Sequence, residues 1–237
     1  MNSSISVVIP LHNQARYLFR AVSSAYWQLG PNDDIIIVND ASTDLDHNRG
    51  GIGPFMDRTV WLDNPVNKGV SFSRNRAILH SSKQWIKFLD ADDVLAPYAL
   101  NCVHHEDEIP EAVKVLAGCC HRMVDNRYYD LFDGAEGNMA FILNMNPMLP
   151  SATLVRRDAL LEVGLFDERI DFEEDWDLWL KLHRRFGASA FAFTPQPLCY
   201  YWIEQSDREL SNRTRTRKVD GIDVREYFRQ QYGANPE

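Results

Sequence analysis

Two aspartates that flank a single alanine form the clearest chemical motif in the sequence. The motif Asp90-Ala91-Asp92 comes directly after the largely apolar run Trp85–Leu89, which predicts a buried strand. Carboxylates in this arrangement can share a divalent cation and the hydroxyls of a ligand, because Mg²⁺ and Mn²⁺ choose oxygen ligands and often bind carboxylates together with phosphates. The alternative interpretation is a solvated turn, in which Asp93 caps a helix that begins near Leu95.

A second candidate group lies in the segment Val38–Asp44. Asp40 follows the apolar run Ile35–Val38, and a carboxylate at that point can accept the imide N–H of a uracil or thymine base. An Asx-type turn explains the same residues without any ligand. Arg74 lies in Gly69–Asn75, on a predicted helix that starts near the same edge. A guanidinium there can contact the base or phosphates of a nucleotide, or it can be partly buried and paired with an aspartate.

Acidic residues also precede or open the predicted helix Trp176–Phe186: Glu173, Glu174, Asp175 and Asp177. The helix dipole favours an acid in the first turn by about 0.3–1 kcal/mol, so a structural explanation of the cluster stays open. The functional explanation is that one of these residues is a general base. An aspartate can deprotonate a hydroxyl while that hydroxyl attacks an electrophile.

The elements that would position these residues alternate between strand and helix as far as residue 95. Short apolar runs predict four strands, Ile5–Pro10, Ile35–Val38, Val60–Leu62 and Trp85–Leu89. Apolar residues at helical spacing predict one helix over Leu18–Leu29 and a second that ends near Leu79. This alternation predicts a parallel α/β sheet, in which ligands bind beyond the carboxyl ends of the strands. Polar clusters stand at three such ends: Leu11–Asn13, Asn39–Asp40 and Asp90–Asp93.

The second half of the chain is less regular. The predicted elements there are strands at Val113–Ala117 and Ser151–Arg156 and helices at Asp158–Val163 and Trp176–Phe186. After Trp202 the chain becomes strongly polar, with four basic residues between Arg213 and Lys218. This stretch is interpreted as a solvated tail, with closure over a diphosphate and attachment to an anionic membrane face as the alternatives.

The overall composition is that of a globular protein with an acidic balance. Of the 237 residues, 25 are Lys or Arg and 34 are Asp or Glu, for a net charge of −9 that disfavours a nucleic-acid partner. We expect a cytoplasmic protein, because no signal peptide or spanning stretch is evident. The four cysteines lack C-x-x-C spacing, so we expect reduced thiols and no zinc site.

Taken in order over Ser6 to Trp202, the motifs resemble those of glycosyltransferase family 2, the inverting enzymes with a GT-A fold. The opening Ser6–Asn13 is similar to the family's first strand and nucleotide loop, and Gly69–Asn75 to its second nucleotide-contacting stretch. Three further motifs match as well: Val38–Asp44 with its base-binding aspartate, Asp90–Asp92 with its D-x-D, and Gly164–Glu168 followed by Glu174–Trp179 with its acceptor-side motif.

The resemblance implies a single α/β GT-A domain over residues 1–204, with a mostly parallel central sheet flanked by helices. Residues 1–95 would form its nucleotide-binding half, 96–204 its acceptor-binding half, and 205–237 a polar C-terminal extension. The donor would be a nucleoside diphosphate sugar, with a UDP-sugar favoured, and the acceptor a saccharide or a lipid-linked molecule. The lipid-linked acceptor leaves peripheral association with the inner membrane face open.

The resemblance also assigns roles to individual residues. Asp175 would be the catalytic base and Asp92 the ligand of Mn²⁺ or Mg²⁺. The remaining predicted contacts, all with the nucleotide sugar, are those of Pro10, His12, Asp40, Arg74 and Asp90. The sequence departs from the family where many members place a histidine, often a metal ligand, shortly after a tyrosine such as Tyr201. Glu204 stands there instead and is a candidate oxygen ligand.

Two other classes of function stay open at this stage. A sugar-phosphate nucleotidyltransferase would also use carboxylates and a metal, although no Gly-rich loop with Lys or Arg follows the first predicted strand. A non-catalytic homologue that binds nucleotide sugars is the other alternative, since the Glu204 departure can impair metal binding.

Overall fold

A computed structural model describes residues 4–46, 49–104, 109–124, 127–132, 142–146, 148–203 and 218–234. Its centre is a nine-stranded mixed sheet in the order β3-β2-β1-β4-β8-β6-β9-β5, with β7 paired to β6. The first four strands of this order are parallel: β3 (Thr59–Asn64), β2 (Asp34–Asp40), β1 (Ile5–Leu11) and β4 (Trp85–Phe88). The predicted α/β class and the parallel strands of the first half are therefore confirmed.

The other half of the sheet mixes both strand directions. The strand β8 (Thr153–Arg156) runs antiparallel to both β4 and β6 (Val115–Val124). The strand β9 (Phe191–Ile203) is parallel to β6, whereas β5 (Val94–Leu95) is antiparallel to β9 and β7 (Arg127–Phe132) to β6. The long strand β9 was not predicted, and the helix expected near Leu95 is wrong because those residues form β5.

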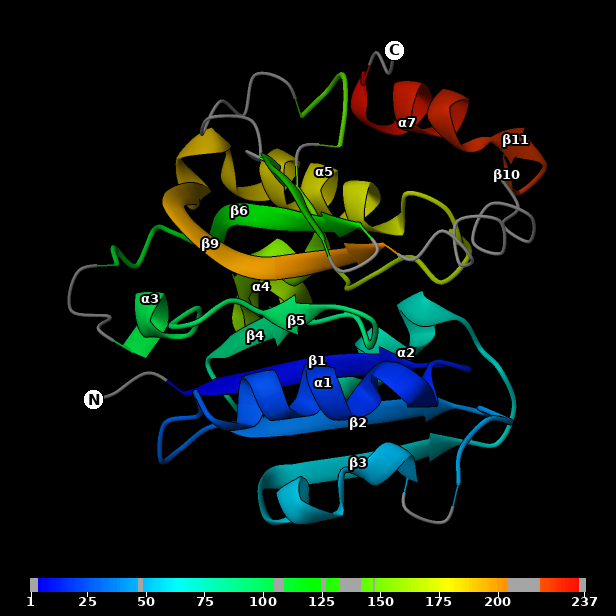
Figure 1. The fold of residues 1–237 in the computed structure, drawn as a ribbon. Helices are drawn as coiled ribbons and strands as arrows, with labels where there is room; N and C mark the ends of the chain where they lie inside the picture. Colours follow the sequence, from blue (N-terminus) through cyan, green and yellow to red (C-terminus); the bar gives the residue numbers. More distant parts are fainter. Residues whose placement is uncertain are drawn as a thin grey trace.

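Helices cover both faces of the sheet (Figure 1). On one face lies α1 (Ala15–Tyr26); on the other lie α2 (Val70–His80), α4 (Arg157–Glu162) and α5 (Glu174–Phe186). Successive residues of β1 point to opposite faces, so Val8 joins the core under α2 and α5 while Val7 and Ile9 join the core under α1. Burial on both faces explains the largely apolar sequences of the parallel strands.

The remaining described elements lie nearer the surface. A short helix, α3 (Asn101–His104), follows β5, and the last described segment contains β10 (Lys218–Val219), β11 (Ile222–Asp223) and α7 (Val224–Tyr232). Figure 1 shows α7 beside α5, and its Val224 and Phe228 belong to the same apolar core as α5. The described part of the chain holds no helix long and apolar enough to cross a bilayer.

Candidate active site

A buried arginine joins two of the predicted motifs beyond the carboxyl ends of the parallel strands. The terminal nitrogens of Arg74 lie 2.7 Å from Asp90 Oδ1 and 2.9 Å from Glu174 Oε1, although Arg74 and Glu174 are 100 residues apart in sequence. Only 2% of Arg74 is exposed. Burial alone would lower the pKa of Arg74, but the two carboxylates raise it, so the guanidinium remains charged.

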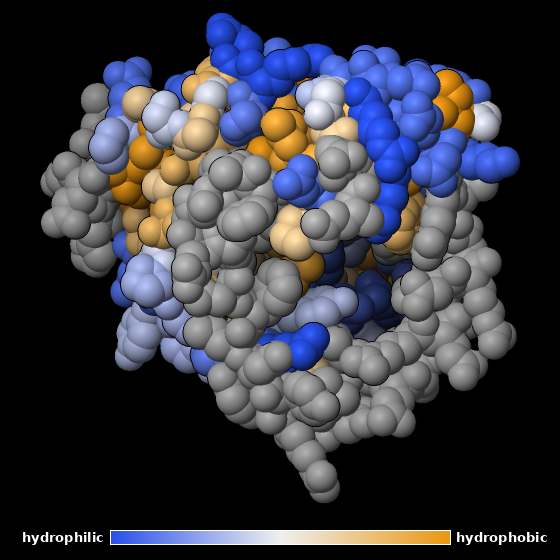
Figure 2. Space-filling view, turned by 90° about the horizontal axis from the view of Figure 1, so that it is seen from above, coloured by the Kyte–Doolittle hydropathy of each residue, from blue (hydrophilic) through white to orange (hydrophobic). Residues whose placement is uncertain are grey.

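This geometry corresponds to the alternative interpretation of Arg74, in which a buried arginine pairs with an aspartate. Its two terminal nitrogens hold the D-x-D turn against the first turn of α5, so the contact expected between Arg74 and a nucleotide stays a prediction. Seen from above in Figure 2, the molecular surface is hollowed near its middle, and the atoms visible inside the hollow are mostly hydrophilic.

The two carboxylates of the D-x-D turn differ in their partners. Asp90 is held by Arg74, and its backbone N–H donates to Ser151 Oγ at 3.0 Å. The Asp92 side chain accepts a 2.9 Å hydrogen bond at Oδ2 from Gln14 Nε2, and its backbone carbonyl accepts one of 2.8 Å from Arg20 Nη2. The turn is therefore oriented from three separate elements of the fold.

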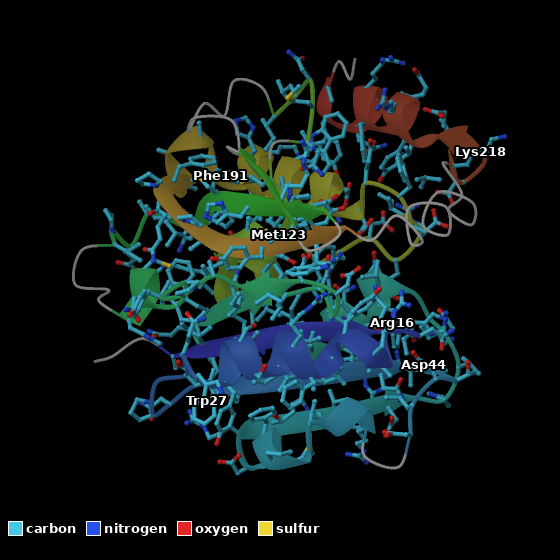
Figure 3. All side chains as sticks on the ribbon, viewed as in Figure 1. Arg16, Trp27, Asp44, Met123, Phe191 and Lys218 are labelled. Atoms are coloured by element: carbon cyan, nitrogen blue, oxygen red, sulfur yellow. The ribbon has the colours of Figure 1, made fainter. Side chains whose placement is uncertain are left out.

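The N-terminus of α1 brings Gln14 to this turn. Asp44 Oδ2 accepts a 2.9 Å hydrogen bond from the backbone N–H of Ala15, the first residue of α1. Figure 3 shows Arg16 and Asp44 together at the side where β1 and β2 end, with Trp27 at the opposite end of α1. Asp44 thus fixes the start of α1 beside the site, as an acceptor at a helix N-terminus should.

The third acid of the sequence Asp90–Asp93 is structural. Asp93 is 1% exposed, and its Oδ1 accepts a 3.1 Å hydrogen bond from the backbone N–H of Trp202 at the end of β9. Burial, together with the charges of Asp92 and Asp90, raises its pKa well above the ordinary value. Asp93 therefore ties the D-x-D turn to β9, and it does not cap a helix.

Asp40 is also buried, with 3% of its surface exposed. Its Oδ1 accepts hydrogen bonds from Asn64 Nδ2 at 2.7 Å and from the backbone N–H of Lys68 at 2.8 Å, and its Oδ2 accepts one from Gly69 N at 2.8 Å. These bonds hold the turn that leads into α2, whose Gly69 adopts a positive φ of 89°. A carboxylate offers about four acceptor positions, so one remains for the predicted contact with a base.

His12 links the ends of β1 and β2. Its Nδ1 lies 2.7 Å from the carbonyl oxygen of Asp40, and because a carbonyl only accepts, Nδ1 must carry the proton. Its Nε2 lies 3.0 Å from Asn67 Nδ2 and 3.2 Å from Asn13 Nδ2, so both ring nitrogens have polar partners. Pro10, a predicted nucleotide contact on β1, pairs with Val38 in the register of β1 and β2.

Asp175 lies in the first turn of α5, next to Glu174, and is 9% exposed. Burial and the neighbouring charge of Glu174 raise the pKa of Asp175 to about 7, against the lowering effects of hydrogen bonds from Asn146 and Trp176 N and of the Arg74 charge. A carboxylate with this pKa is a stronger proton acceptor than a solvated aspartate. The arrangement therefore suits the role of general base near neutral pH.

Several supporting residues were not predicted. Gln14 and Ser151 hold the D-x-D turn, and below that turn the fully buried Lys87 donates from Nζ to the carbonyl oxygens of Ser151 at 2.5 Å and Thr153 at 3.3 Å. Burial lowers the pKa of Lys87 to about 8. A lysine inside an otherwise apolar strand was the one signal that the sequence offered for this contact.

The structure gathers no group of three or more His, Cys, Asp or Glu side chains suited to a metal among the residues that it describes. Asp92 nevertheless fits the predicted role, because it offers a half-buried carboxylate and Mg²⁺ or Mn²⁺ commonly binds one or two carboxylates plus substrate phosphates. Two further predictions, Glu204 as a ligand and residues 213–217 of the basic stretch, lie outside the described residues. Lys218 is described and begins β10.

The parallel strands, the mixed second half and the acidic motifs beyond the strand ends define a GT-A fold. The same fold is found in Staphylococcus aureus TarS 1–349 in complex with UDP-GlcNAc, with a TM-score of 0.69 and 18% identity over 84% of this chain and 58% of that one. The mannosyltransferase PcManGT of Pyrobaculum calidifontis, in complex with GDP-Man and Mn²⁺, gives a TM-score of 0.64 and 15% identity over 85% and 57% of the two chains.

The family model described as glycosyl transferase family 2 matches residues 6–129, and the chain belongs to that family. One curated relative is the uncharacterized glycosyltransferase RP339 of Rickettsia prowazekii, 28% identical over 192 residues. That alignment covers 76% of this chain and 58% of the relative. The chain thus spans well under two thirds of the relative's length.

Proposed function

We propose that the chain transfers a sugar from a nucleoside diphosphate sugar to an acceptor hydroxyl and inverts the anomeric centre. The observation that supports this most directly is the Arg74 bridge, which joins Asp90 of the predicted donor site to Glu174, the neighbour of the predicted base. A donor-binding motif and a buried proton acceptor on facing segments are what a direct displacement requires. Family membership and the names of the curated relatives support the same class of reaction.

In this proposal Asp175 is the general base. The acceptor hydroxyl attacks the anomeric carbon from the face opposite the nucleotide, its oxygen–hydrogen bond breaks, and the proton passes to an oxygen of Asp175. The bond from the anomeric carbon to the diphosphate oxygen breaks in the same displacement, which inverts the centre. Because Asp175 must be ionised to accept the proton, kcat should rise with pH through about 7.

The donor is held by the carboxyl ends of the parallel strands. Asp40, Arg74 and the backbone near Pro10 hold the nucleobase, His12 contacts the nucleotide sugar, and Asp90 binds the ribose. We favour a UDP-sugar, since TarS, which shares the fold, is found in complexes with UDP and with UDP-GlcNAc.

Asp92 would hold Mn²⁺ or Mg²⁺ in this proposal. When bound, such an ion would supply stabilisation of the negative charge that develops on the leaving group. The complex of PcManGT with GDP-Man and Mn²⁺ shows that a protein of this fold is found with such an ion.

The proposal also covers the acceptor, the cellular location and the two halves of the domain. The acceptor is a saccharide or a lipid-linked molecule, and the chain works in the cytoplasm with optional peripheral contact to the inner membrane face. Residues 1–95 form the donor half and 96–204 the acceptor half of one domain.

A panel of nucleotide sugars tests the proposal. The chain is incubated with each donor and Mn²⁺, and release of the nucleoside diphosphate is followed. We expect one donor to be turned over, and we expect Asp175→Asn to lower kcat by about 10²–10⁴-fold while UDP affinity is kept. Asp158→Asn, which makes the same charge change at an exposed position of α4, is the matched control and should keep full activity.

Two results would count against this function. Turnover retained by Asp175→Asn would remove the base assignment. Pyrophosphate release from a sugar 1-phosphate and a nucleoside triphosphate, with no donor turned over, would identify a nucleotidyltransferase instead.

A further inference from the structure

The last described helix packs against the helix that contains Asp175. The Phe228 ring of α7 meets the Trp176 ring of α5 edge-on, with 5.1 Å between their centroids. One turn further along α7, Tyr232 Oη donates a 2.6 Å hydrogen bond to Asp177 Oδ1. Residues four positions apart share a helix face, so a single face of α7 contacts the two residues that follow Asp175.

The hydrogen bond from Tyr232 satisfies a buried carboxylate, that of Asp177. Asp177 is fully buried, and a buried carboxylate must be paired and hydrogen-bonded to be tolerated. Its Oδ2 lies 2.8 Å from Lys181 Nζ, and its Oδ1 accepts from Tyr232. Burial and the charge of Asp177 raise the pKa of Tyr232, so its hydroxyl stays protonated and continues to donate.

The first turn of α5 needs such contacts because its own capping is poor. The N-cap position is Glu173, which has a left-handed φ of 60° and makes no side-chain capping hydrogen bond. Trp176 is instead held from two sides: its indole N–H donates to the carbonyl oxygen of Ile142 at 2.6 Å, and its ring packs on Phe228. The direction of this turn is therefore set by tertiary contacts.

We propose that α7 is a positioning element for the catalytic base, acting through Tyr232 on Asp177 and through Phe228 on Trp176. The inference rests on the proposed function, in which Asp175 removes the acceptor proton. Tyr232 is a positioning residue, because it acts on Asp175 only through the first turn of α5, which the Tyr232–Asp177 and Phe228–Trp176 contacts hold in place. A segment expected to be a polar extension thereby takes part in placing the reactive carboxylate.

The test compares two tyrosine variants of the same helix in the full chain. Tyr232→Phe keeps the ring and removes only the hydroxyl that reaches Asp177. We expect kcat to fall about tenfold, because small misplacements of a catalytic group cost up to about 10²-fold, while the KM of the donor and the affinity for UDP stay unchanged. Phe228→Leu should give the same kcat-only signature.

Tyr227→Phe is the matched control, because the hydroxyl of Tyr227 accepts from Arg169 Nη2 at 3.4 Å, whereas that of Tyr232 donates to Asp177 of α5. It should leave kcat at the wild-type value. Wild-type kcat in Tyr232→Phe, or a loss of UDP affinity as large as the loss of kcat, would overturn the proposal. If Asp175→Asn is inactive while Tyr232→Phe is fully active, only the role of α7 fails; if Asp175→Asn keeps its turnover, the base assignment itself fails.

Discussion

Two buried aspartates, one at the amino ends (the amino edge) and one at the carboxyl ends (the carboxyl edge) of the parallel strands, have pKa values that shift in opposite directions. Asp33, before β2, accepts hydrogen bonds from Ile5 N at 2.8 Å, Gly30 N at 2.7 Å and the His104 ring at 2.6 Å. Burial alone would raise the pKa of Asp33, but these three donors lower it below its ordinary value. Asp175 experiences burial and the charge of Glu174, and its pKa rises to about 7.

The difference separates a structural aspartate from the aspartate that we propose as the general base. At the amino edge every donor around Asp33 favours the carboxylate, which joins β1 to the loop before β2. At the carboxyl edge a second carboxylate is placed beside Asp175, and Arg74 compensates that pair only in part. Burial and a like charge raise the pKa of Asp175, as they also raise that of the structural Asp93. The candidate base is therefore marked by its raised pKa together with its position beyond the carboxyl ends of the strands.

Among these variants, the largest loss of stability is expected from replacing Arg74, the counter-ion at the carboxyl edge. Arg74→Met leaves the Asp90 and Glu174 carboxylates without their counter-ion, and we expect the free energy of unfolding to fall by about 3 kcal/mol in urea titrations. This value is at the low end for a broken buried pair, because the Asp90 side chain is 34% exposed. The Arg74 charge also lowers the pKa of Asp175, so the acid limb of kcat should move to higher pH in the variant.

Arg76→Met, on the same helix, is the control for Arg74. Its guanidinium binds the carbonyl oxygen of Asp63 and the amide oxygen of Asn64, both neutral groups, so we expect a loss of about 1 kcal/mol. Equal losses of unfolding free energy in the two variants would show that the Arg74 ion pairs stabilise the fold no more than hydrogen bonds to neutral groups do.

Metal removal should separate donor binding from the rest of the site. Chelation of the metal should collapse UDP binding, and Asp92→Asn should weaken metal-dependent UDP affinity in calorimetry by more than Gln14→Leu does. For Gln14→Leu we expect about tenfold, the lower end of the range for residues that orient a metal ligand. UDP affinity that is unchanged in Asp92→Asn at saturating Mn²⁺ would contradict the assignment of Asp92.

The parallel half of the fold could be predicted because its signals are local. A strand that is buried on both faces needs a mostly apolar run; β1 and β2 each have one, and in β4 only Lys87 interrupts it. The strand β9 and the helix α7 were missed for the opposite reason. In β9 the segment Thr194–Pro197, which contains two prolines, separates two apolar runs. In α7 the residues Val224, Phe228 and Tyr232 lie among polar ones, and the partners that bury them are distant in sequence.

The site shows the same limit. The acidic motifs could be recognised by residue type and by their positions, Asp90 and Asp92 after a strand and Asp175 at the start of a helix. Their supports could not, because Gln14 reaches Asp92 across 78 residues and Ser151 reaches Asp90 across 61. Single-sequence patterns thus identify groups with chemical potential, while the orientation of those groups depends on pairings that only the folded chain brings together.

Replacing the structural acid Asp33 should affect stability alone. The pKa of Asp33 is lowered in the fold, so its contribution is present above the ordinary value of about 3.8 and is lost as pH falls through the folded pKa. Asp33→Asn should therefore cost about 1–2 kcal/mol of unfolding free energy at pH 7, with kcat unchanged, and less at pH 3. Urea unfolding at the two pH values measures this difference. A deficit as large at pH 3 as at pH 7, or a fall in kcat at pH 7, would mean that Asp33 does more than hold the amino edge.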